Sequence, residues 1–418
     1  MRKQVLLLLV FALVFTGIVV QAEERVALRV VTMFAGADAA ADAYQEAIEQ
    51  FQAANPYIEI IDESATFDDS VKVRIENDFA AGNEADITMY FTDAMSTPIV
   101  ESGRVLAIDQ LLQADPEWAN AFSQPALEQI RYQDGKLYAL PITGFYEGLI
   151  LNVDLFTRYD VEYPTSWDKL VTAIEVFKEN DIVPMALGLG STPHYQIEHS
   201  VLKVGGAAAH GAGLAHGIHP MWIEGLKNIK ELYDMGAFQK DTLTQGWEGA
   251  RTLFKQGKAA MIVEGSWAIA DCQNDGANTV TMIAYPKSGP LGDGTDMIAG
   301  FTSGMYLSKE AYHDPEKKEA VLRLYKFLTS KEFIKKIAEA NGGLPAAKVT
   351  PARLTQPYLD GLAAFQAAKH VCLPIDAQIP RPAWQEIVNG IAYICAGRKS
   401  PEEVLTAARE IYLEIKRQ

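Results

Sequence analysis

Short apolar runs alternate with longer segments of helical periodicity in the first part of the chain. β-Branched and apolar residues dominate 28–34, 57–61 and 86–91, which predicts three strands. Between them, apolar residues recur at helical spacing within 39–54 and 71–81, followed by an Asn-Pro pair and by a glycine, respectively. Strands that alternate with helices in this way indicate a parallel or mixed β-sheet with helices on both faces.

The same alternation continues to the C-terminus. Further strands are predicted at 149–152, 183–187, 259–263, 279–284 and 305–308. Further helices are predicted at 167–180, 223–235, 247–256, 315–330, 332–340, 358–369, 383–396 and 401–416. Thr165 and Asp168 are spaced as a capping box at the start of the first of these helices. The sequence shows no repeat and no long linker, so we expect two lobes between which the chain crosses more than once.

Length and charge limit the classes of protein to consider. The chain has 418 residues, of which 49% are hydrophobic, a composition typical of a globular protein built from domains of roughly 100–200 residues. It carries 54 acidic residues against 37 Lys and Arg residues, for a net charge of −17, and it has no dense basic run. Nucleic acids and anionic membranes attract positive surfaces, so we expect neither as a partner.

The N-terminus has the pattern of a cleavable secretory signal. Two basic residues precede an unbroken apolar run over 5–15, and residues 20–22 (Val-Gln-Ala) suit a signal peptidase. The run is short for a membrane span, which needs about 20 residues. We therefore predict cleavage after residue 22 and a periplasmic or extracellular location; an uncleaved membrane anchor is the alternative. Because the leader contains no cysteine, we expect no lipid anchor.

Cysteine and histidine give little evidence for a metal site. Cys272, Cys372 and Cys395 have no Cys-x-x-Cys spacing, which argues against structural zinc, and either one disulfide or three free thiols fit the count. Five histidines lie within 194–219, and three of them, His210, His216 and His219, are in a Gly/Ala-rich stretch that we interpret as a loop. No run of carboxylates accompanies them, so we predict no metal and no cofactor, with a metal site in this stretch as the alternative.

Signatures of known catalytic sites are incomplete in this sequence. There is no Gly-x-Ser-x-Gly elbow, and the Ser166-x-x-Lys169 pair lacks its companion motifs. Neither a phosphate-binding loop nor a dinucleotide fingerprint is present. Chance explains each partial match better than a catalytic role does.

Aromatic residues gather at the predicted strand ends and loop starts. They include Tyr90 near Asp93, Phe145 near Glu147, Tyr195 beside His194, Trp267 and Trp384. Ligands of α/β proteins bind outside the carboxyl ends of the strands. Aromatic faces stack on the C–H faces of sugars, and carboxylates accept hydrogen bonds from sugar hydroxyls. The pattern suggests a sugar site, although core packing explains each aromatic residue at least as well when it is taken alone.

Five longer segments carry a combined pattern: 51–60, 135–141, 149–156, 254–267 and 342–345. The most telling is 254–267, which reads Phe-Lys-Gln-Gly-Lys-Ala-Ala-Met-Ile-Val-Glu-Gly-Ser-Trp. In order and spacing, these segments resemble the extracellular solute-binding proteins of bacterial ABC importers, in the carbohydrate branch that includes the maltose-binding proteins. The resemblance extends over nearly the whole mature chain.

This resemblance implies an α/β architecture, the periplasmic-binding-protein fold. Two α/β lobes are joined by a hinge with several crossings, and the ligand binds in a cleft between lobes that close around it. We expect the crossings near 143–147, 284–290 and 343–345. Lobe one then comprises residues 23–143 plus 287–343, and lobe two comprises 144–286 plus 344–418.

The resemblance also assigns ligand-binding positions. Asp93 matches an acidic residue that bonds sugar hydroxyls, Tyr90 lies near it, and Trp267 and Trp384 match stacking aromatic residues of lobe two. Phe145 replaces a ligand-bonding glutamate of the maltose-binding members, which puts a maltose-like ligand in doubt. The other expected ligand-binding residues are Phe34, Asp38, Phe67, Asp68, Glu147, His194, Tyr195, Gly300 and Arg381.

The implied function is that of a non-catalytic, monomeric receptor, which delivers a mono- or oligosaccharide to the transmembrane subunits of an ABC permease. Alternative ligands are a polyamine, an organophosphate or a metal ion. A phosphate ester needs basic residues, and Arg381 is the only one we place near the site; a cation needs more acids than Asp93 and Glu147. A secreted glycan hydrolase is a further alternative, because Asp93 with Glu147 or Glu264 could form a carboxylate pair.

Overall fold

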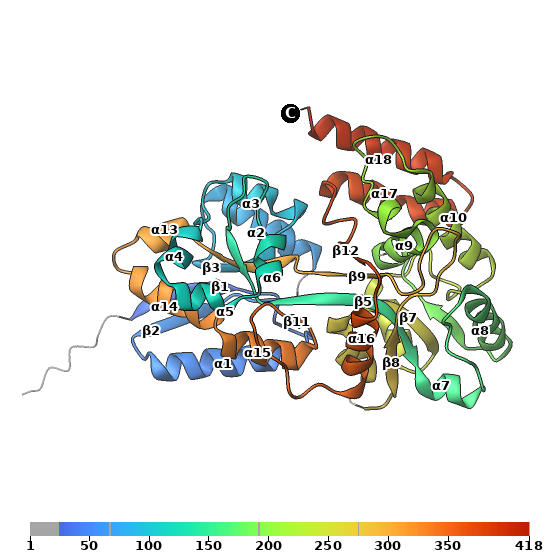
Figure 1. Ribbon diagram of the computed structural model, residues 1–418, viewed down its shortest axis with the longest axis horizontal. Coiled ribbons are helices and arrows are strands. Elements are labelled where there is room, and N and C mark those ends of the chain that lie inside the picture. The colour runs from blue at the N-terminus through green and yellow to red at the C-terminus, as the bar shows by residue number, and fades with distance from the viewer. Residues whose placement is uncertain (1–24, 67, 191–192, 275, 418) are drawn as a thin grey trace, which may run out of the picture.

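Two α/β lobes lie side by side in the computed structural model, which describes residues 25–66, 68–190, 193–274 and 276–417 (Figure 1). Each lobe has one large cluster of buried apolar residues on one face of its sheet and a smaller cluster on the other face. The predicted fold class is therefore confirmed. Phe67, which we expect in the ligand site, lies outside the described residues.

The sheet of lobe one has the strand order β2-β1-β3-β10-β4. Its strands are β1 (Val26–Val31), β2 (Ile58–Asp62), β3 (Ile87–Phe91), β4 (Ala139–Pro141) and β10 (Ser303–Leu307). Strand β1 pairs in parallel with β2 and β3, whereas β10 runs antiparallel to β3 and β4. The sheet is thus mixed, as the alternating pattern predicts.

Helices cover both faces of this sheet. The face with the larger cluster is covered by α1 (Ala41–Ala54), α4 (Asp109–Ala114), α5 (Pro116–Ala121), α6 (Gln124–Gln129), α13 (Lys309–His313), α14 (Lys318–Leu328) and α15 (Lys331–Asn341). The other face carries α2 (Asp69–Ala81), η1 (Ala94–Ser96) and α3 (Thr97–Glu101). In α1, the helical repeat seen in the sequence is the buried stripe: Tyr44, Ala47, Ile48 and Phe51.

The main path of the sheet in lobe two is β12-β9-β5-β7-β6, and β8 and β11 also pair with β5. Its strands are β5 (Thr143–Asn152), β6 (Val183–Ala186), β7 (Ala259–Gly265), β8 (Val280–Ile283), β9 (Met297–Gly300), β11 (Leu344–Pro345) and β12 (Val371–Cys372). Strand β5 is fully or partly buried along its ten residues and pairs with β7, β8, β9 and β11, so it is the central strand of this lobe.

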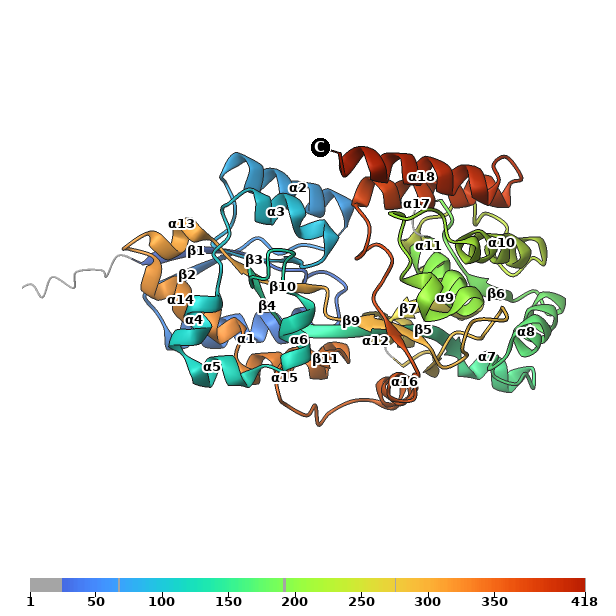
Figure 2. The same ribbon diagram turned by 45° about the horizontal axis from the view of Figure 1, so that its top comes forward.

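Helices also cover both faces of the lobe-two sheet. The larger cluster involves α7 (Val153–Arg158), α8 (Trp167–Glu179), α9 (His194–His210), α10 (Pro220–Asp234), α17 (Arg381–Cys395) and α18 (Pro401–Ile415). The smaller one involves α11 (Trp247–Lys255), η2 (Ser266–Ala268), α12 (Ile269–Gln273) and α16 (Gln356–Gln366). Figure 2 shows the α17–α18 pair lying over lobe two, with the first turn of α17 directed toward lobe one.

Within the described residues, the chain passes between the lobes three times. It passes from β4 to β5, from β9 back to β10, and from α15 through β11 to α16. The second passage lies at residues 301–302, later than the crossing expected near 284–290, because β9 pairs with β5 in the sheet of lobe two. The apolar pattern of β9 does not distinguish a strand of one sheet from a strand of the other, so its lobe depends on pairing with distant residues.

Two local predictions differ from the structure, and four short helices are not predicted. Ser166, not Thr165, caps α8, and its side chain accepts a hydrogen bond from the Lys169 backbone. The Gly/Ala-rich stretch is a loop only after His210; up to that residue it belongs to the long helix α9, which has a kink at Gly206. Finally, the short helices α3 to α6 fall in a region for which the sequence pattern predicts no helix, because they are too short to show two turns of periodicity.

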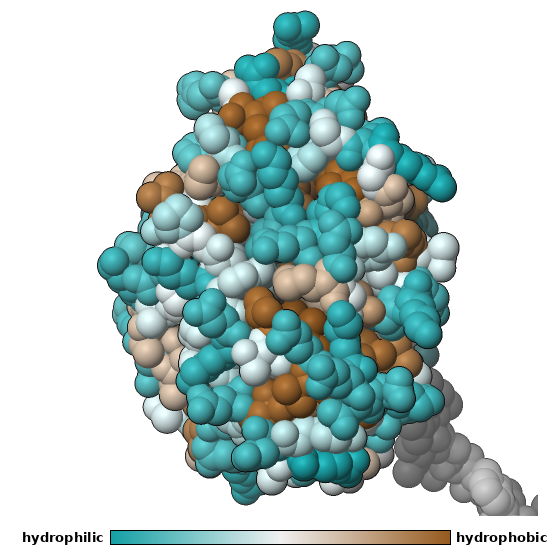
Figure 3. Space-filling view, turned by 90° about the vertical axis from the view of Figure 1, so that its right-hand side faces the viewer, coloured by the Kyte–Doolittle hydropathy of each residue, from teal (hydrophilic) through white to brown (hydrophobic). Residues whose placement is uncertain are grey.

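Three further features concern the cysteines, the length of the helices and the surface of lobe two. Cys272, Cys372 and Cys395 are all free thiols, which resolves the choice left open by the sequence. No helix of the described chain is long and apolar enough to cross a membrane. On the outer end of lobe two, apolar residues form small areas interrupted by polar side chains (Figure 3).

Candidate functional site

Contacts between the lobes define where a ligand would be enclosed. The backbone N–H of Ala94, just after β3 in lobe one, donates to the carbonyl of Ala377 in lobe two at 3.3 Å. Arg381 Nη1, at the start of α17, lies 3.3 Å from Glu76 Oε1 on α2. We call the region beside these contacts the interlobe site; its residues are Asp38, Asp93, Phe145, Glu147, Tyr195, Glu198, Trp267 and Asp376.

Four aromatic rings of lobe two cluster in the interlobe site. Trp267 lies in η2 directly after β7, with the Phe145 ring centroid 5.5 Å and the Tyr195 ring centroid 5.8 Å from its own. The His194 ring lies 3.9 Å from that of Tyr195. All four side chains are partly exposed, unlike those of a core cluster, so they offer surface against which a flat apolar ligand face can stack. The structure therefore brings together four residues that the sequence singles out.

Glu147 and His199 form a buried pair behind these rings. Glu147 Oε2 lies 3.6 Å from His199 Nε2, and the glutamate is only 2% exposed. Burial, followed by the nearby Asp376 carboxylate, raises the pKa of Glu147 well above its ordinary value. Burial also lowers the pKa of His199 well below its ordinary value. The imidazole is therefore neutral at physiological pH and supplies no positive charge to the glutamate.

Asp376 connects the carboxylates of both lobes. It lies between β12 and α17, and next to burial it is the largest cause that raises the pKa values of Asp93, Glu147 and Glu198. Burial raises the pKa of Asp376 itself to about 6, although the ammonium group of Lys72 acts in the opposite direction. Neither carboxylate oxygen of Glu198 accepts a well-formed hydrogen bond from the described residues, although the backbone N–H groups of Ile375 and Asp376 lie close enough to lower its pKa.

Glu264 differs from these carboxylates because basic and polar groups of lobe two surround it. The Trp247 indole N–H donates to it, and Arg251 Nε lies 3.6 Å away. The Arg251 guanidinium carbon is 3.8 Å from the centre of the Trp247 ring, and Arg251 Nη1 is 3.3 Å from Asp271. From lobe one, Asp38 approaches this arginine; burial raises the pKa of Asp38 to about 6, and Arg251 partly offsets that rise.

Other residues predicted for the site lie elsewhere or have local structural partners. Phe34 is buried in the core of lobe one, with its ring centroid 5.9 Å from that of Tyr44, and Trp384 is 6% exposed in the core of lobe two. Tyr90 is fully buried, and its hydroxyl donates to Glu76 at 2.7 Å. Because these three rings are enclosed by protein, they offer little surface for ligand stacking in this conformation.

Asp68 and Gly300 have roles that the backbone geometry explains. Asp68 caps α2 by accepting hydrogen bonds from the backbone N–H groups of Ser70 and Val71 at 2.9 and 3.0 Å. Gly300 pairs with Phe145 across β9 and β5. A Cβ atom at Gly300 would lie 2.6 Å from the Leu373 side chain, so glycine permits this close packing beside the first aromatic ring.

Asp376 and Glu198, the two acids that connect the carboxylate group, are not among the site residues predicted from the sequence. Asp376 lies in a segment between two predicted helices that has no periodicity of its own. Glu198 could have been predicted from the sequence, because Tyr195, Glu198 and His199 have the i, i+3, i+4 spacing of one helix face. Because no helix is predicted over these residues, that spacing is not recognised.

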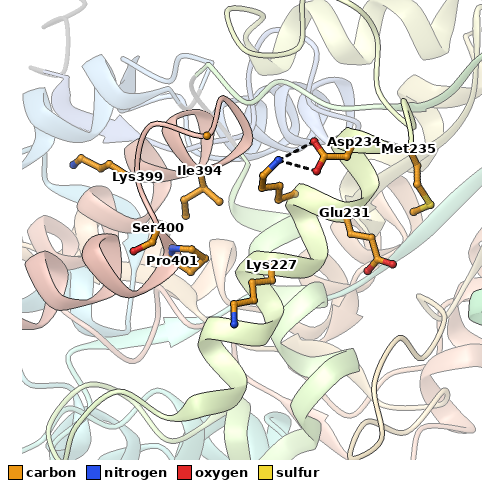
Figure 4. Close-up of a pocket in the computed structure, with 10 residues that line it drawn as sticks. Lys227, Glu231, Asp234, Met235, Ile394, Lys399, Ser400 and Pro401 are labelled. Atoms are coloured by element: carbon orange, nitrogen blue, oxygen red, sulfur yellow. Dashed lines mark hydrogen bonds and ion pairs between the residues drawn. The ribbon is translucent and has the colours of Figure 1, made fainter.

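A groove on lobe two is separate from the interlobe site. It has a volume of about 580 Å³ and lies between α10 and the junction of α17 with α18 (Figure 4). Lys227, Lys230 and Lys399 are among its lining residues, but Lys230 pairs with Asp234 at 2.7 Å across its side. Among the described residues, no three His, Cys, Asp or Glu side chains are grouped so that they could hold a metal ion.

Comparison with known proteins agrees with this architecture. Residues 37–334 match the bacterial extracellular solute-binding protein family, and the chain belongs to that family. A binding protein of Brucella abortus is 26% identical over 378 residues, which cover 87% of each chain.

Two further similarities concern proteins whose names specify sugars. The multiple sugar-binding protein of Streptococcus mutans is 26% identical over 224 residues, covering 51% of this chain and 52% of that protein. The solved structure of a chitin oligosaccharide binding protein is 22% identical, covers 94% of this chain and 99% of its own, and has a TM-score of 0.81. This structural likeness confirms the fold.

Proposed function

We propose that the protein is a non-catalytic receptor that binds a mono- or oligosaccharide between its two lobes and delivers it to the transmembrane subunits of an ABC permease. The observation that carries the proposal is the group of partly exposed rings around Trp267 beside the carboxylates of Glu147 and Asp93. Rings that stack on sugar C–H faces and acids that accept hydroxyl hydrogen bonds are the two elements a sugar site requires. The sugar-binding names of two similar proteins support the same ligand class.

The interlobe contacts support a receptor that closes around its ligand. The Ala94–Ala377 hydrogen bond and the Glu76–Arg381 ion pair join the two lobes. Closure of this kind encloses the ligand and creates a distinct surface that a permease can recognise. We further propose that the protein is exported through cleavage after residue 22 and acts as a monomer. We also propose that the boundaries between the two lobes lie at the three passages between the sheets.

Thermal unfolding of residues 23–418 tests the ligand class. A panel of mono- and oligosaccharides is compared with polyamines, glycerol phosphates and divalent metal ions. A ligand that binds only the folded state must raise the midpoint, so we expect a saturable increase with one sugar class. An increase with phosphates or metal ions alone would overturn the sugar assignment. Turnover of chromogenic glycosides is measured in parallel, and we expect none.

Trp267→Ala tests the position of the site. Losing the indole removes stacking and apolar burial against the ligand, so we expect binding to weaken by about 1–3 kcal/mol. Isothermal titration with the sugar found in the panel gives this value. Trp384→Phe is the matched control, because Trp384 lies in the core of lobe two and its replacement should alter stability rather than affinity. Unchanged affinity for Trp267→Ala would show that the sugar binds elsewhere.

A further inference from the structure

The interlobe site contains more carboxylates than its own cations neutralise. Asp376 lies close enough to Asp93, Glu147 and Glu198 to raise the pKa of each, and the four acids come from both lobes. Of the described residues, none forms an ion pair with Asp93, Glu198 or Asp376 within 4.0 Å. A cationic ligand requires more acids than Asp93 and Glu147, and Glu198 and Asp376 supply them.

The nearby basic groups have other partners or lie outside the centre of the group. Arg251 pairs with Glu264 and Asp271 at 3.6 and 3.3 Å. Arg381 contacts Glu76 at 3.3 Å, and His199 is neutral because burial lowers its pKa. Lys72 approaches Asp376 from α2, where its effect is too small to return the pKa of that acid to its ordinary value.

Glu198 gives independent evidence for a missing partner. Its side chain is about 1% exposed, no basic side chain of the described residues pairs with it, and only the backbone N–H groups of Ile375 and Asp376 lie close enough to its carboxylate to lower its pKa. Glu147 likewise leaves Oε2 without a hydrogen bond. Leaving a buried charged or polar group unpaired costs several kcal/mol, so native proteins usually supply a partner. A positively charged ligand group would be such a partner.

We propose that the ligand is a saccharide bearing a protonated amino group, whose ammonium is received by Glu147, Glu198 and Asp376 while its sugar ring stacks on Trp267. The inference rests on the proposed sugar-binding function and narrows it to amino sugars. An ammonium group donates three hydrogen bonds, which matches three acids that converge from β5, α9 and the segment before α17. Aromatic faces also attract cations, so the same rings favour this ligand over a neutral sugar.

Matched sugars test the charge directly. The mature chain, residues 23–418, is titrated with β-1,4-linked disaccharides that carry an ammonium, an acetamide or a hydroxyl at C2, and with the glucosamine–glucose, galactosamine–galactose and mannosamine–mannose pairs. Measurements are made at pH 6.5. We expect at least one amine to bind more tightly than its uncharged counterparts by about tenfold to a hundredfold, the effect typical of a hydrogen bond to a charged partner.

Different results would overturn the amino-sugar inference and the broader sugar-binding function. If an uncharged sugar binds as tightly as its amine, the inference is overturned and the sugar-binding function stands. If no sugar in the panels binds, or spermidine alone binds, the sugar-binding function is overturned together with the inference.

Glu198→Gln provides the second readout. It preserves size but removes the charge, so we expect an amino sugar to lose about tenfold more affinity than its uncharged parent does. Glu319→Gln, in an exposed ion pair on α14, is the control and should change neither. Thermal unfolding checks that Glu198→Gln is folded, and Asp376→Asn replaces it if it is not. Equal losses for both sugars would overturn the charge-specific role.

Discussion

At the scale of single residues, Asp376 of the candidate site lies where folding disfavours its charged form. Asp93 from lobe one, Glu147 on β5, Tyr195 and Glu198 on α9, and Lys72 on α2 all interact electrostatically with it. Burial raises its pKa to about 6, so the ionised form is disfavoured in the folded protein. Functional sites commonly carry such perturbed groups.

Asp376→Asn should therefore stabilise the ligand-free protein, and only where the aspartate is ionised. With a folded pKa above the ordinary value, the folded state binds more protons than the unfolded state between about pH 4 and 6, and stability falls as pH rises through that interval. Asparagine cannot ionise, so we expect a gain of about 2 kcal/mol at pH 8 and almost none at pH 4. Urea unfolding at both values measures it.

Asp293→Asn is the control of opposite sign. Hydrogen bonds from Thr295 lower the pKa of Asp293 to about 2, so its ionised form is favoured by folding. The replacement should lose stability at pH 8, and the loss should vanish as pH falls toward the folded pKa. A gain of stability at pH 8 for both variants would show that removing any negative charge from this acidic chain is enough to stabilise it.

At the scale of elements, the sequence predicts the helices that have local features such as an apolar stripe or a capping box. Helix α1 buries the four residues that its periodicity singles out, and α18 begins where Ser400 and Glu403 form a capping box. Helix α9 is different, because almost all of its first three turns are buried and no polar face remains to show a period. A helix enclosed by its lobe has no amphipathic signal, and glycines within it further suggest a loop.

The residues of the candidate site are likewise predicted from the sequence only where the pattern that marks them is local. Trp267, Phe145 and Tyr195 follow or begin predicted elements and are found from the sequence, whereas Glu198 and Asp376 come together only through the packing of α9 against the segment before α17. The excess of acidic over basic side chains in the site therefore arises from tertiary packing. Single-residue patterns reveal which rings could stack, but they do not reveal which carboxylates share a site.

The kink of α9 depends on Gly206. Its φ of 73° and ψ of 176° belong to a region open essentially to glycine, and a Cβ atom there would lie 2.6 Å from the Leu291 carbonyl oxygen. Just before it, the Lys203 ammonium donates to the carbonyls of Asp293 and Gly294 at 3.1 Å each. The kink thus lets the first half of α9 reach the interlobe site while remaining attached to the loop before β9.

Gly206→Ala should destabilise the protein by about 3–4 kcal/mol, from backbone strain and the clash together. Gly213→Ala separates the two causes, because Gly213 also has a positive φ, 61°, but no atom lies within 4 Å of the added methyl group. We expect that control to cost about 1–2 kcal/mol in denaturant unfolding. Equal losses for the two variants would show that the Leu291 contact relaxes freely.

At the scale of the whole molecule, the contacts between the lobes determine how much of the binding energy is used for closure. Glu76 on α2 accepts from the Tyr90 hydroxyl of its own lobe and contacts Arg381 of the other, so it joins the core of lobe one to the start of α17. Arg381 and Glu76 are 28% and 23% exposed, which limits a pair of this kind to about 1 kcal/mol. A ligand that binds only between closed lobes has its apparent affinity reduced by the fraction of molecules that are open.

Glu76→Gln keeps the hydrogen-bond acceptor for Tyr90 but removes the charge that attracts Arg381. We expect ligand affinity to fall about two- to fivefold and the radius of gyration of the unliganded protein, from small-angle X-ray scattering, to increase. Saturating ligand should restore the compact form, because the ligand supplies contacts to both lobes. Glu319→Gln again serves as control, since its pair with Arg323 lies within one helix of lobe one. A lower affinity without any change in the unliganded dimensions would place the role of Glu76 in ligand contact rather than in closure.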